Sequence, residues 1–198
     1  MPFSPVEQLR DHALAAAVKR RAGELGFDLV GIAPAEPSRY RGYLRDWLVG
    51  GKAGSMEYLA RRFEERTDPG TYLPGTRSVV CVAMNYHVPL EPLADEQKAT
   101  HGRVARYALG NDYHEVIKAR LRALADWMRE LAPEAQTRVA VDTAPVLERE
   151  LATRAGIGWV GKNTCLINER AGSWPCTACT APMDDKGPDR ESKEIERQ

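Results

Sequence analysis

Apolar residues recur at helical spacing in five stretches of the chain. The strongest stretch is Asp112–Leu131, which Pro133 follows. The first stretch begins at Ser4, where a Ser-x-x-Glu capping box precedes an apolar stripe, and it ends at Gly26. The other predicted helices run from Tyr40 to Gly50, from Met56 to Glu65 and from Thr143 to Gly156.

Short apolar runs between these helices predict strands at Leu29–Ala33, Ser78–Met84, Arg138–Val141 and Cys165–Ile167. The run Ser78–Met84 is apolar on both faces, which is typical of a central strand that helices cover on both sides. Strands and helices alternate along the chain. We therefore predict an α/β domain with a mixed sheet covered by helices.

The character of the chain changes after Trp174. Three prolines punctuate the rest, and residues 184–198 hold six acidic and four basic residues with Ile195 as the one aliphatic side chain. Such a segment buries too little apolar surface to offset the entropy of ordering it. We expect one domain over residues 1–174 and a disordered polar tail over residues 175–198.

The charge of the chain is balanced, with 28 Lys and Arg against 28 Asp and Glu in 198 residues. The total indicates no broad basic surface for nucleic acid, although a local patch is compatible with it. The longest apolar run, Val79–Met84, is too short to cross a membrane, and no signal peptide follows Met1. Four cysteines fit a reducing compartment. We expect a cytoplasmic protein that makes no membrane contact.

The densest group of unusual residues lies between Val141 and Trp174. Asp142 stands where a strand ends and a helix is about to begin, and ligands of open α/β sheets collect at this edge. An equally good interpretation is that Asp142 or Thr143 caps the helix.

Three glycines in the same segment, Gly156, Gly158 and Gly161, have the Gly-x-Gly-x-x-Gly spacing. They follow a helix instead of joining a strand to one, which argues against a dinucleotide site. With Lys162 and Asn163 they fit a loop that closes over a flat or phosphorylated ligand, or alternatively a tight turn.

Two further clusters contain polar side chains. His114 lies in the first turn of the predicted long helix, where a surface or partly buried role is the more common one. The string Asp112-Tyr113-His114 is similar to a cobalt-ligating Asp-x-His-x-x-Gly motif, but Ile117 stands where that motif needs glycine, so we reject the match. Arg66 lies at the exit of a charged helix, from which it can reach into a cleft.

The cysteines predict no metal site. Cys81 and Cys165 fit packing positions. Cys176 and Cys179 form a Cys-x-x-Cys pair, but zinc sites and iron–sulfur clusters usually need four ligands, and neither a second pair nor a nearby histidine is present.

Taken in order, three groups of motifs resemble the amino-terminal domain of epoxyqueuosine reductase: MEYL with RFEERTDP and LPGTRSVVCVAMNY, then YALGNDYH, then VDTAPVLERELATRAGIGWVGKNTCLI. The resemblance covers roughly residues 10–174. It implies a cobalamin-dependent enzyme that reduces an epoxide on a modified base of transfer RNA (tRNA) to an alkene, the last step of queuosine synthesis. The cobalamin is expected base-off over the α/β domain.

The resemblance also assigns roles to particular residues. Asp142, in Val-Asp-Thr, matches the family's proton donor. The cobalamin-contacting region matches Arg66, Lys162 and Asn163, and two further positions would contact the corrin through backbone or apolar surface, Ala105 and Ile167. No residue of the chain is expected to ligate a metal.

The chain departs from the family pattern after Trp174. The resemblance implies a ferredoxin-like region in which eight cysteines hold two 4Fe–4S clusters, whereas the whole chain has four cysteines. We therefore expect a truncated or frame-shifted copy, or a stand-alone domain, that lacks its electron supply, with tRNA and an electron-donor protein as the expected partners. The alternatives are a non-catalytic corrin-binding module and a flavin-type redox domain.

Overall fold

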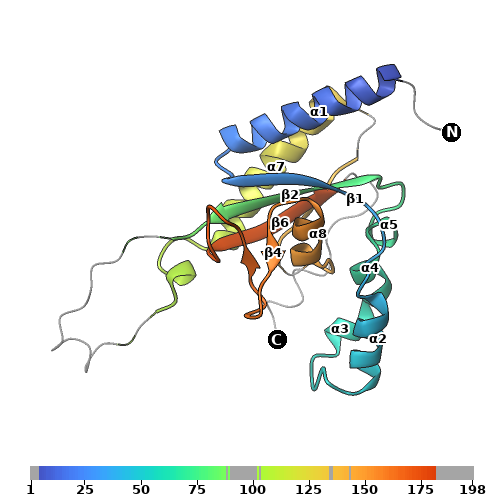
Figure 1. The fold of residues 1–198 in the computed structure, drawn as a ribbon, viewed down its shortest axis with the longest axis vertical. Helices are drawn as coiled ribbons and strands as arrows, with labels where there is room; N and C mark the ends of the chain where they lie inside the picture. Colours follow the sequence, from blue (N-terminus) through green and yellow to red (C-terminus); the bar gives the residue numbers. More distant parts are fainter. Residues whose placement is uncertain are drawn as a thin grey trace.

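The core of the protein is a four-stranded sheet in the order β1-β2-β6-β3. The computed structural model describes residues 5–87, 89, 102, 104–133, 136–142 and 144–181 (Figure 1). The strands are β1 (Leu29–Pro34), β2 (Ser78–Asn85), β6 (Pro175–Ala181) and β3 (Arg138–Ala140). All three pairings between neighbouring strands are antiparallel.

Strand β2 is buried on both faces because successive side chains of a strand point in opposite directions. Val79, Cys81 and Ala83 belong to one apolar cluster, and Val80 and Val82 belong to another. Each cluster is completed by helices from its own side of the sheet. The continuous apolar run seen in the sequence is therefore explained by helices on both sides.

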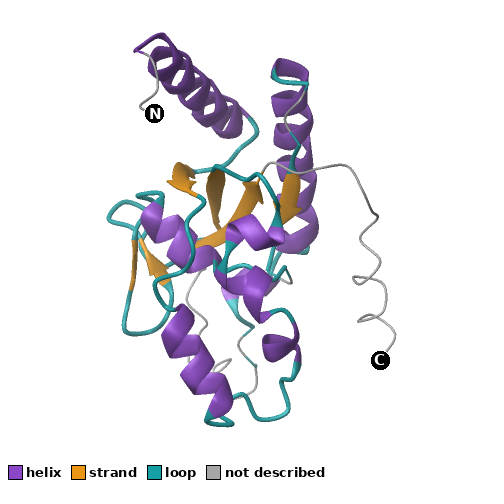
Figure 2. Ribbon diagram, turned by 90° about the vertical axis from the view of Figure 1, so that its right-hand side faces the viewer, coloured by secondary structure: helices purple, strands orange, loops and turns teal. Residues whose placement is uncertain are grey.

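Two long helices, α1 (Pro5–Glu24) and α7 (Tyr113–Leu131), cover one face of the sheet (Figure 2). The side chains that fill this side include the fully buried Leu121 and Leu124 of α7. The start of α7 is fixed by Asp112, whose side chain accepts a hydrogen bond from the His114 backbone N–H at 2.9 Å. None of the helices in the described residues is long and apolar enough to cross a membrane.

Helix α8 (Glu148–Arg154) covers the opposite face and packs Leu151 and Ala152 against the sheet. A hairpin of β4 (Trp159–Val160) and β5 (Leu166–Ile167) follows it. The remaining elements are short: α2 (Arg41–Val49), α3 (Tyr58–Arg61), α4 (Phe63–Thr67), α5 (Pro69–Tyr72) and the 3₁₀ helix η1 (Arg106–Ala108).

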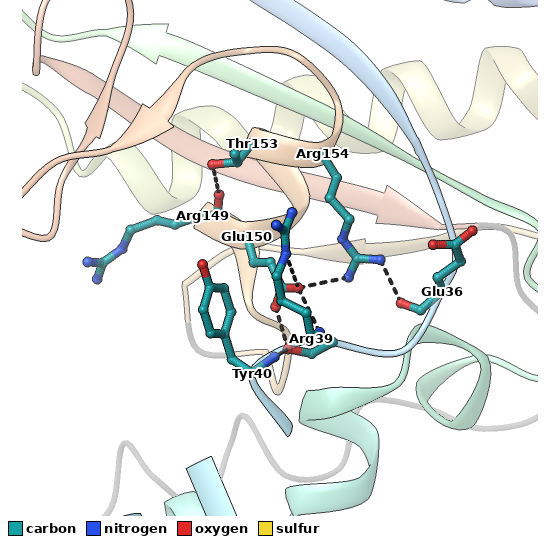
Figure 3. Close-up of polar contacts among 8 residues, drawn as sticks. Glu36, Arg39, Tyr40, Arg149, Glu150, Thr153 and Arg154 are labelled. Atoms are coloured by element: carbon teal, nitrogen blue, oxygen red, sulfur yellow. Dashed lines mark hydrogen bonds and ion pairs between the residues drawn. The ribbon is translucent and has the colours of Figure 1, made fainter. Parts of the chain in front are cut away.

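A buried glutamate ties α8 to the segment between β1 and α2 (Figure 3). Glu150 accepts hydrogen bonds from the Ser38 hydroxyl and from the Arg39 backbone N–H, the latter at 3.1 Å. Arg154 forms an ion pair with Glu150 at 3.4 Å and donates to the Glu36 carbonyl at 2.8 Å. The network therefore fixes the segment that leads from β1 into α2 against α8.

The predicted α/β domain with helices over a sheet is confirmed. The sheet was expected to be mixed, but its described strands pair only in the antiparallel sense. The helix predicted at Met56–Glu65 is split into α3 and α4 because the backbone leaves helical geometry at Arg62, with φ −120° and ψ 41°.

The predicted domain boundary after Trp174 is wrong, since the first residues of the expected tail form β6 between β2 and β3. Small side chains explain this placement: Ala178, Cys179 and Thr180 are each no more than 2 % exposed and fit the crowded centre of the sheet. Pro175 is tolerated because it is the first residue of the strand. The remainder of the expected tail, residues 182–198, lies outside the described residues.

Candidate functional site

Asp142 lies two residues beyond the end of β3, at the edge of the sheet where β2 also ends and β6 begins. Its φ of 49° is in the left-handed region, which aspartate tolerates better than most residues. Helix α8 begins only at Glu148, and its N-cap residue Leu147 makes no side-chain capping bond. The capping interpretation of Asp142 is therefore wrong, and its carboxylate is left for another role; Thr143 lies outside the described residues.

His114 joins Asp142 to the start of α7. Its Nε2 lies 2.9 Å from Oδ2 of Asp142, and its Nδ1 lies 2.8 Å from Oδ1 of Asp112. The neighbouring Tyr113 ring stacks on the imidazole with 3.9 Å between the ring centroids. The capped first turn of α7 thus holds the histidine between two carboxylates.

The charges around His114 favour its protonated form. Burial opposes a charge on the imidazole, but the hydrogen bonds to Asp142 and Asp112 outweigh it and raise the pKa of His114. The pKa of Asp112 is lowered by the hydrogen bonds that it accepts from the His114 backbone and side chain. Burial, with the nearby Asp142, raises the pKa of Tyr113 to about 12, so this phenol stays neutral.

A second carboxyl group, that of Glu148 at the start of α8, interacts with Asp142. Burial, together with the negative charge of Asp142, raises the pKa of Glu148 to about 8, while a hydrogen bond from the Asp142 backbone opposes the shift. Oε1 of Glu148 is buried and has no hydrogen-bond partner in the described part of the chain. Glu148 is therefore a neutral acid at neutral pH.

Arg66 of α4 faces the same carboxyl group. Burial lowers the pKa of Arg66, and the charges of Tyr58 and Glu148 partly offset this. Its buried Nε also has no hydrogen-bond partner among the residues described. Two predicted site residues, Arg66 and Asp142, thus both interact electrostatically with Glu148.

Aromatic rings line the same edge of the sheet. Tyr107 lies edge-on to Tyr113 at 6.0 Å and to Tyr86 at 6.3 Å, and Tyr86 lies edge-on to Trp174 at 5.7 Å, all between ring centroids. The Arg106 guanidinium lies 4.9 Å from the centroid of the Trp174 ring. Ala105, which the resemblance places against a corrin, is exposed at the N-cap of η1 beside this cluster.

The other predicted cofactor residues lie together on the β4–β5 hairpin. Lys162 and Asn163 are exposed in its loop, and Asn163 Oδ1 accepts the Cys165 backbone N–H at 3.2 Å. Ile167, in β5, is half-buried and packs so closely on Gly161 that a Cβ there would lie 2.4 Å from its Cδ1. The stricter requirement for glycine is at Gly158, where a Cβ would lie 2.1 Å from the backbone oxygen of Ile167.

A hydrogen bond from α8 ties the hairpin to the rest of the site. The Arg149 guanidinium of α8 donates to the Thr164 carbonyl in the hairpin loop. Burial raises the pKa of Tyr86, and the thiols of Cys176 and Cys165 add to the shift. The predicted turn interpretation and a loop over a ligand are both compatible with this geometry.

The Cys-x-x-Cys pair does not form a ligand pair, because Cys176 and Cys179 point to opposite faces of β6. Cys179 lies opposite Cys81 with 3.5 Å between the sulfur atoms, and burial raises the pKa of Cys176 to about 11. Within the described residues, no group of three or more His, Cys, Asp or Glu side chains could hold a metal ion.

Sequence reasoning missed two members of the site. His114 was expected at a surface or partly buried position, which its intermediate exposure confirms, but its place between two carboxylates was not predicted, and Glu148 was not among the predicted site residues. A local signal existed for His114, since Asp112 two residues earlier both caps the helix and reaches the ring. For Glu148 no local signal existed, because its burial depends on the packing of α8 on the sheet.

The sequence of the chain is similar to those of known proteins. Residues 66–143 match the family described as "Epoxyqueuosine reductase QueG, DUF1730". The epoxyqueuosine reductase of Pseudomonas aeruginosa is 40% identical over 177 residues, which are 87% of this chain and 47% of that protein. The one from Gloeobacter violaceus is 43% identical over 162 residues, which are 81% of this chain and 49% of that protein.

Solved structures show the same relationship. Epoxyqueuosine reductase from Streptococcus thermophilus has a TM-score of 0.74 and 26% identity, over 89% of this chain and 47% of that one. A structure of the Bacillus subtilis enzyme, with its catalytic aspartate loop swung out of the active site, has a TM-score of 0.72 and 25% identity. The match covers 90% of this chain and 47% of that one. An epoxyqueuosine reductase bound to an epoxyqueuosine-modified tRNA stem loop has a TM-score of 0.69 and 26% identity. The match covers 90% of this chain and 47% of that one.

The chain spans about half the length of the curated relatives that it matches. Sequence and fold together relate it to the epoxyqueuosine reductases and fit the amino-terminal domain of that family.

Proposed function

We propose that this chain provides the cobalamin-binding and proton-donating domain of an epoxyqueuosine reductase, which reduces epoxyqueuosine in tRNA to queuosine. The observation that carries the proposal is the Asp142 carboxylate at the sheet edge, hydrogen-bonded to His114 in a chain of this family. A related structure holds an epoxyqueuosine-modified tRNA stem loop, which supports tRNA as the substrate.

The proposed reaction defines what the site must do. Conversion of an epoxide to an alkene consumes two electrons and two protons and releases the oxygen as water. Opening of the ring places negative charge on that oxygen, which leaves poorly until it is protonated. Asp142 is exposed over 58% of its side chain, so its carboxyl can meet a substrate oxygen, and we assign it the transfer of one proton.

The proposed cobalamin residues fit a broad, flat ligand with amide arms. The Arg66 Nε is buried without a partner among the described residues, which suits a polar arm of such a ligand. Lys162, Asn163 and Ala105 are exposed, and Ile167 adds apolar surface. When bound and reduced, cobalamin supplies the electrons for the epoxide. The corrin ring carries its own cobalt, so no cluster of protein ligands is required.

The electrons have to reach the site from elsewhere. The resemblance implies two 4Fe–4S clusters, and the Cys-x-x-Cys pair of β6 cannot join such a cluster with both sulfur atoms on one side. We therefore propose an electron donor outside residues 5–181. The four cysteines are free thiols, which supports a reducing, cytoplasmic location.

The experiment that tests the function combines binding and turnover. Purified protein titrated with cobalamin should give a base-off corrin spectrum, and with chemically reduced cobalamin it should convert epoxyqueuosine in an RNA stem loop. Asp142→Asn should retain the spectrum and lose turnover by about 100-fold or more. Asp46→Asn, an exposed change on α2, is the matched control. Retained turnover in Asp142→Asn would remove the proton-donor role.

The same measurements separate the alternatives. Corrin binding with no turnover in the wild-type chain would favour a non-catalytic corrin-binding module. A preparation that binds flavin and no corrin would favour a flavin-type redox domain.

A further inference from the structure

The His114 ring makes hydrogen bonds with two carboxylates that come from different parts of the fold. Asp112 precedes α7 and Asp142 follows β3, and the two ring nitrogens lie 2.8 Å and 2.9 Å from their oxygens. A neutral imidazole has one N–H and can donate to one of these carboxylates, whereas an imidazolium can donate to both. The geometry is therefore fully satisfied by a protonated His114 between two ionised carboxylates.

This arrangement creates a problem for a proton donor. A carboxylate that accepts a hydrogen bond from an imidazolium carries no proton of its own, so Asp142 needs a source before it can deliver one. We propose that His114 holds the proton that Asp142 delivers to the substrate oxygen and is itself reloaded from solvent at Nε2, while its Nδ1–H stays on Asp112. The inference rests on the proposed function, and it makes His114 a positioning residue that acts through Asp142.

The exposure of the three side chains fits reloading of His114 from water. Asp112 is 63% exposed and reaches solvent, His114 is 33% exposed, and Asp142 is 58% exposed at the edge of the sheet. The stacked Tyr113 ring fixes the imidazole plane between the two carboxylates. Water can therefore return a proton to Nε2 of the partly exposed ring, while the hydrogen bond from Nδ1 to Asp112 holds the ring in place.

The steps balance without any change in electrons. The Nε2–H bond of His114 breaks as an O–H bond forms on Asp142, and that O–H bond breaks as the substrate oxygen is protonated. Neutral His114 keeps its Nδ1–H toward Asp112, and a proton from solvent restores Nε2–H. The net result is one proton moved from water to the oxygen released by the reaction.

The charges that face His114 agree with this role. The two carboxylates raise its pKa despite burial, and Tyr113, whose pKa is about 12, adds no charge. Glu148 interacts electrostatically with Asp142 and is neutral below its pKa of about 8. Because a raised pKa keeps the imidazolium at neutral pH, turnover should fall as pH rises through the His114 pKa.

The first test needs no cofactor or substrate. Nitrogen-15 NMR of the chain should show one of its four histidines titrating above the ordinary value, and His114→Gln should remove that resonance. Asp142→Asn should move the titration of His114 to lower pH, and so should Asp112→Asn. His12→Gln, on the exposed surface of α1, is the control. An unchanged His114 titration in Asp142→Asn would overturn the proposal.

The second test measures turnover on the epoxyqueuosine stem loop with chemically reduced cobalamin. His114→Gln should bind cobalamin like the wild type, lose roughly 100-fold in rate and lose the alkaline fall of the wild-type profile. A full rate in His114→Gln would also overturn the proposal. If the wild-type chain binds no corrin, the proposed function fails while the NMR result still decides whether His114 is held protonated. If His114→Gln does not fold, the Asp142→Asn titration decides alone.

Discussion

Two glutamates of α8, Glu148 and Glu150, show two ways of burying a carboxyl group. Glu150 is 7% exposed and accepts from the Ser38 hydroxyl and the Arg39 backbone, with Arg154 as its ion-pair partner (Figure 3). Glu148, two residues earlier, leaves one buried oxygen without a hydrogen bond in the described structure and lies beside the charge of Asp142.

The difference in hydrogen bonding distinguishes the two roles. Glu150 is a carboxylate that stabilises the fold, whereas Glu148 is a carboxyl group of the candidate site. A buried charge is stable when donors and a counter-ion surround it, as at Glu150. At Glu148 the donors are fewer and a like charge is close, so the neutral acid is favoured and its pKa rises to about 8. Strongly shifted pKa values such as that of Glu148 are concentrated at functional sites.

The largest expected effect is on stability and comes from Glu150→Ala. The change leaves Arg154, Ser38 and the Arg39 backbone without their shared acceptor. Breaking a buried ion pair from one side costs about 3–5 kcal/mol, which urea unfolding followed by circular dichroism would measure. The control is Glu130→Ala on the exposed face of α7, where a change within about 0.5 kcal/mol is expected. Equal losses in both variants would contradict a structural role for Glu150.

The second prediction concerns the pH dependence of stability and uses Glu148→Gln. The folded pKa of Glu148 is about 8, against an ordinary value of 4.5. Between these values the unfolded chain has released a proton that the folded chain retains, so the free energy of unfolding should fall as pH rises. Glutamine stays neutral and removes that fall.

At pH 9 the variant should therefore be more stable than the wild type, by on the order of a few kcal/mol, whereas at pH 5 the two should be close. Urea unfolding at both pH values measures the difference. Glu150→Gln is the matched control on the same helix, and it should destabilise at both pH values because glutamine cannot pair with Arg154 as a charge. A wild-type curve that does not fall between pH 5 and pH 9 would contradict the neutral Glu148.

The comparison also shows which parts of the molecule the sequence could predict. Burial on both faces of β2 was predicted from its continuous apolar run, and the stop at Gly156, with φ 75°, followed from the need for a left-handed residue there. Asp142 was placed correctly at a strand end. These features depend on residues close together in the chain.

The features that failed depend on residues far apart. Pro175–Ala181 contains a proline and small or polar residues, so its place between β2 and β3 is decided by the space those strands leave. Glu148 and Glu150 have the same side chain on the same helix, and only the distant Ser38 and Asp142 make them different. No local pattern contains that information.

The smallest expected effect is that of Asp142→Asn on the pKa of Glu148. The charge of Asp142 is a cause of the high Glu148 pKa, second to burial, so its removal should lower that pKa below about 8 while leaving Glu148 buried. The fall in stability should then still begin near pH 4.5 but end at a lower pH with a smaller total, a change of under about 1 kcal/mol at pH 9. Carbon-13 NMR of the glutamate carboxyl carbons measures the shift directly. The exposed Asp46→Asn should leave the Glu148 titration unchanged. If Asp142→Asn also left it unchanged, burial alone would account for the neutral acid, and Glu148 would be independent of the proton-donating residue beside it.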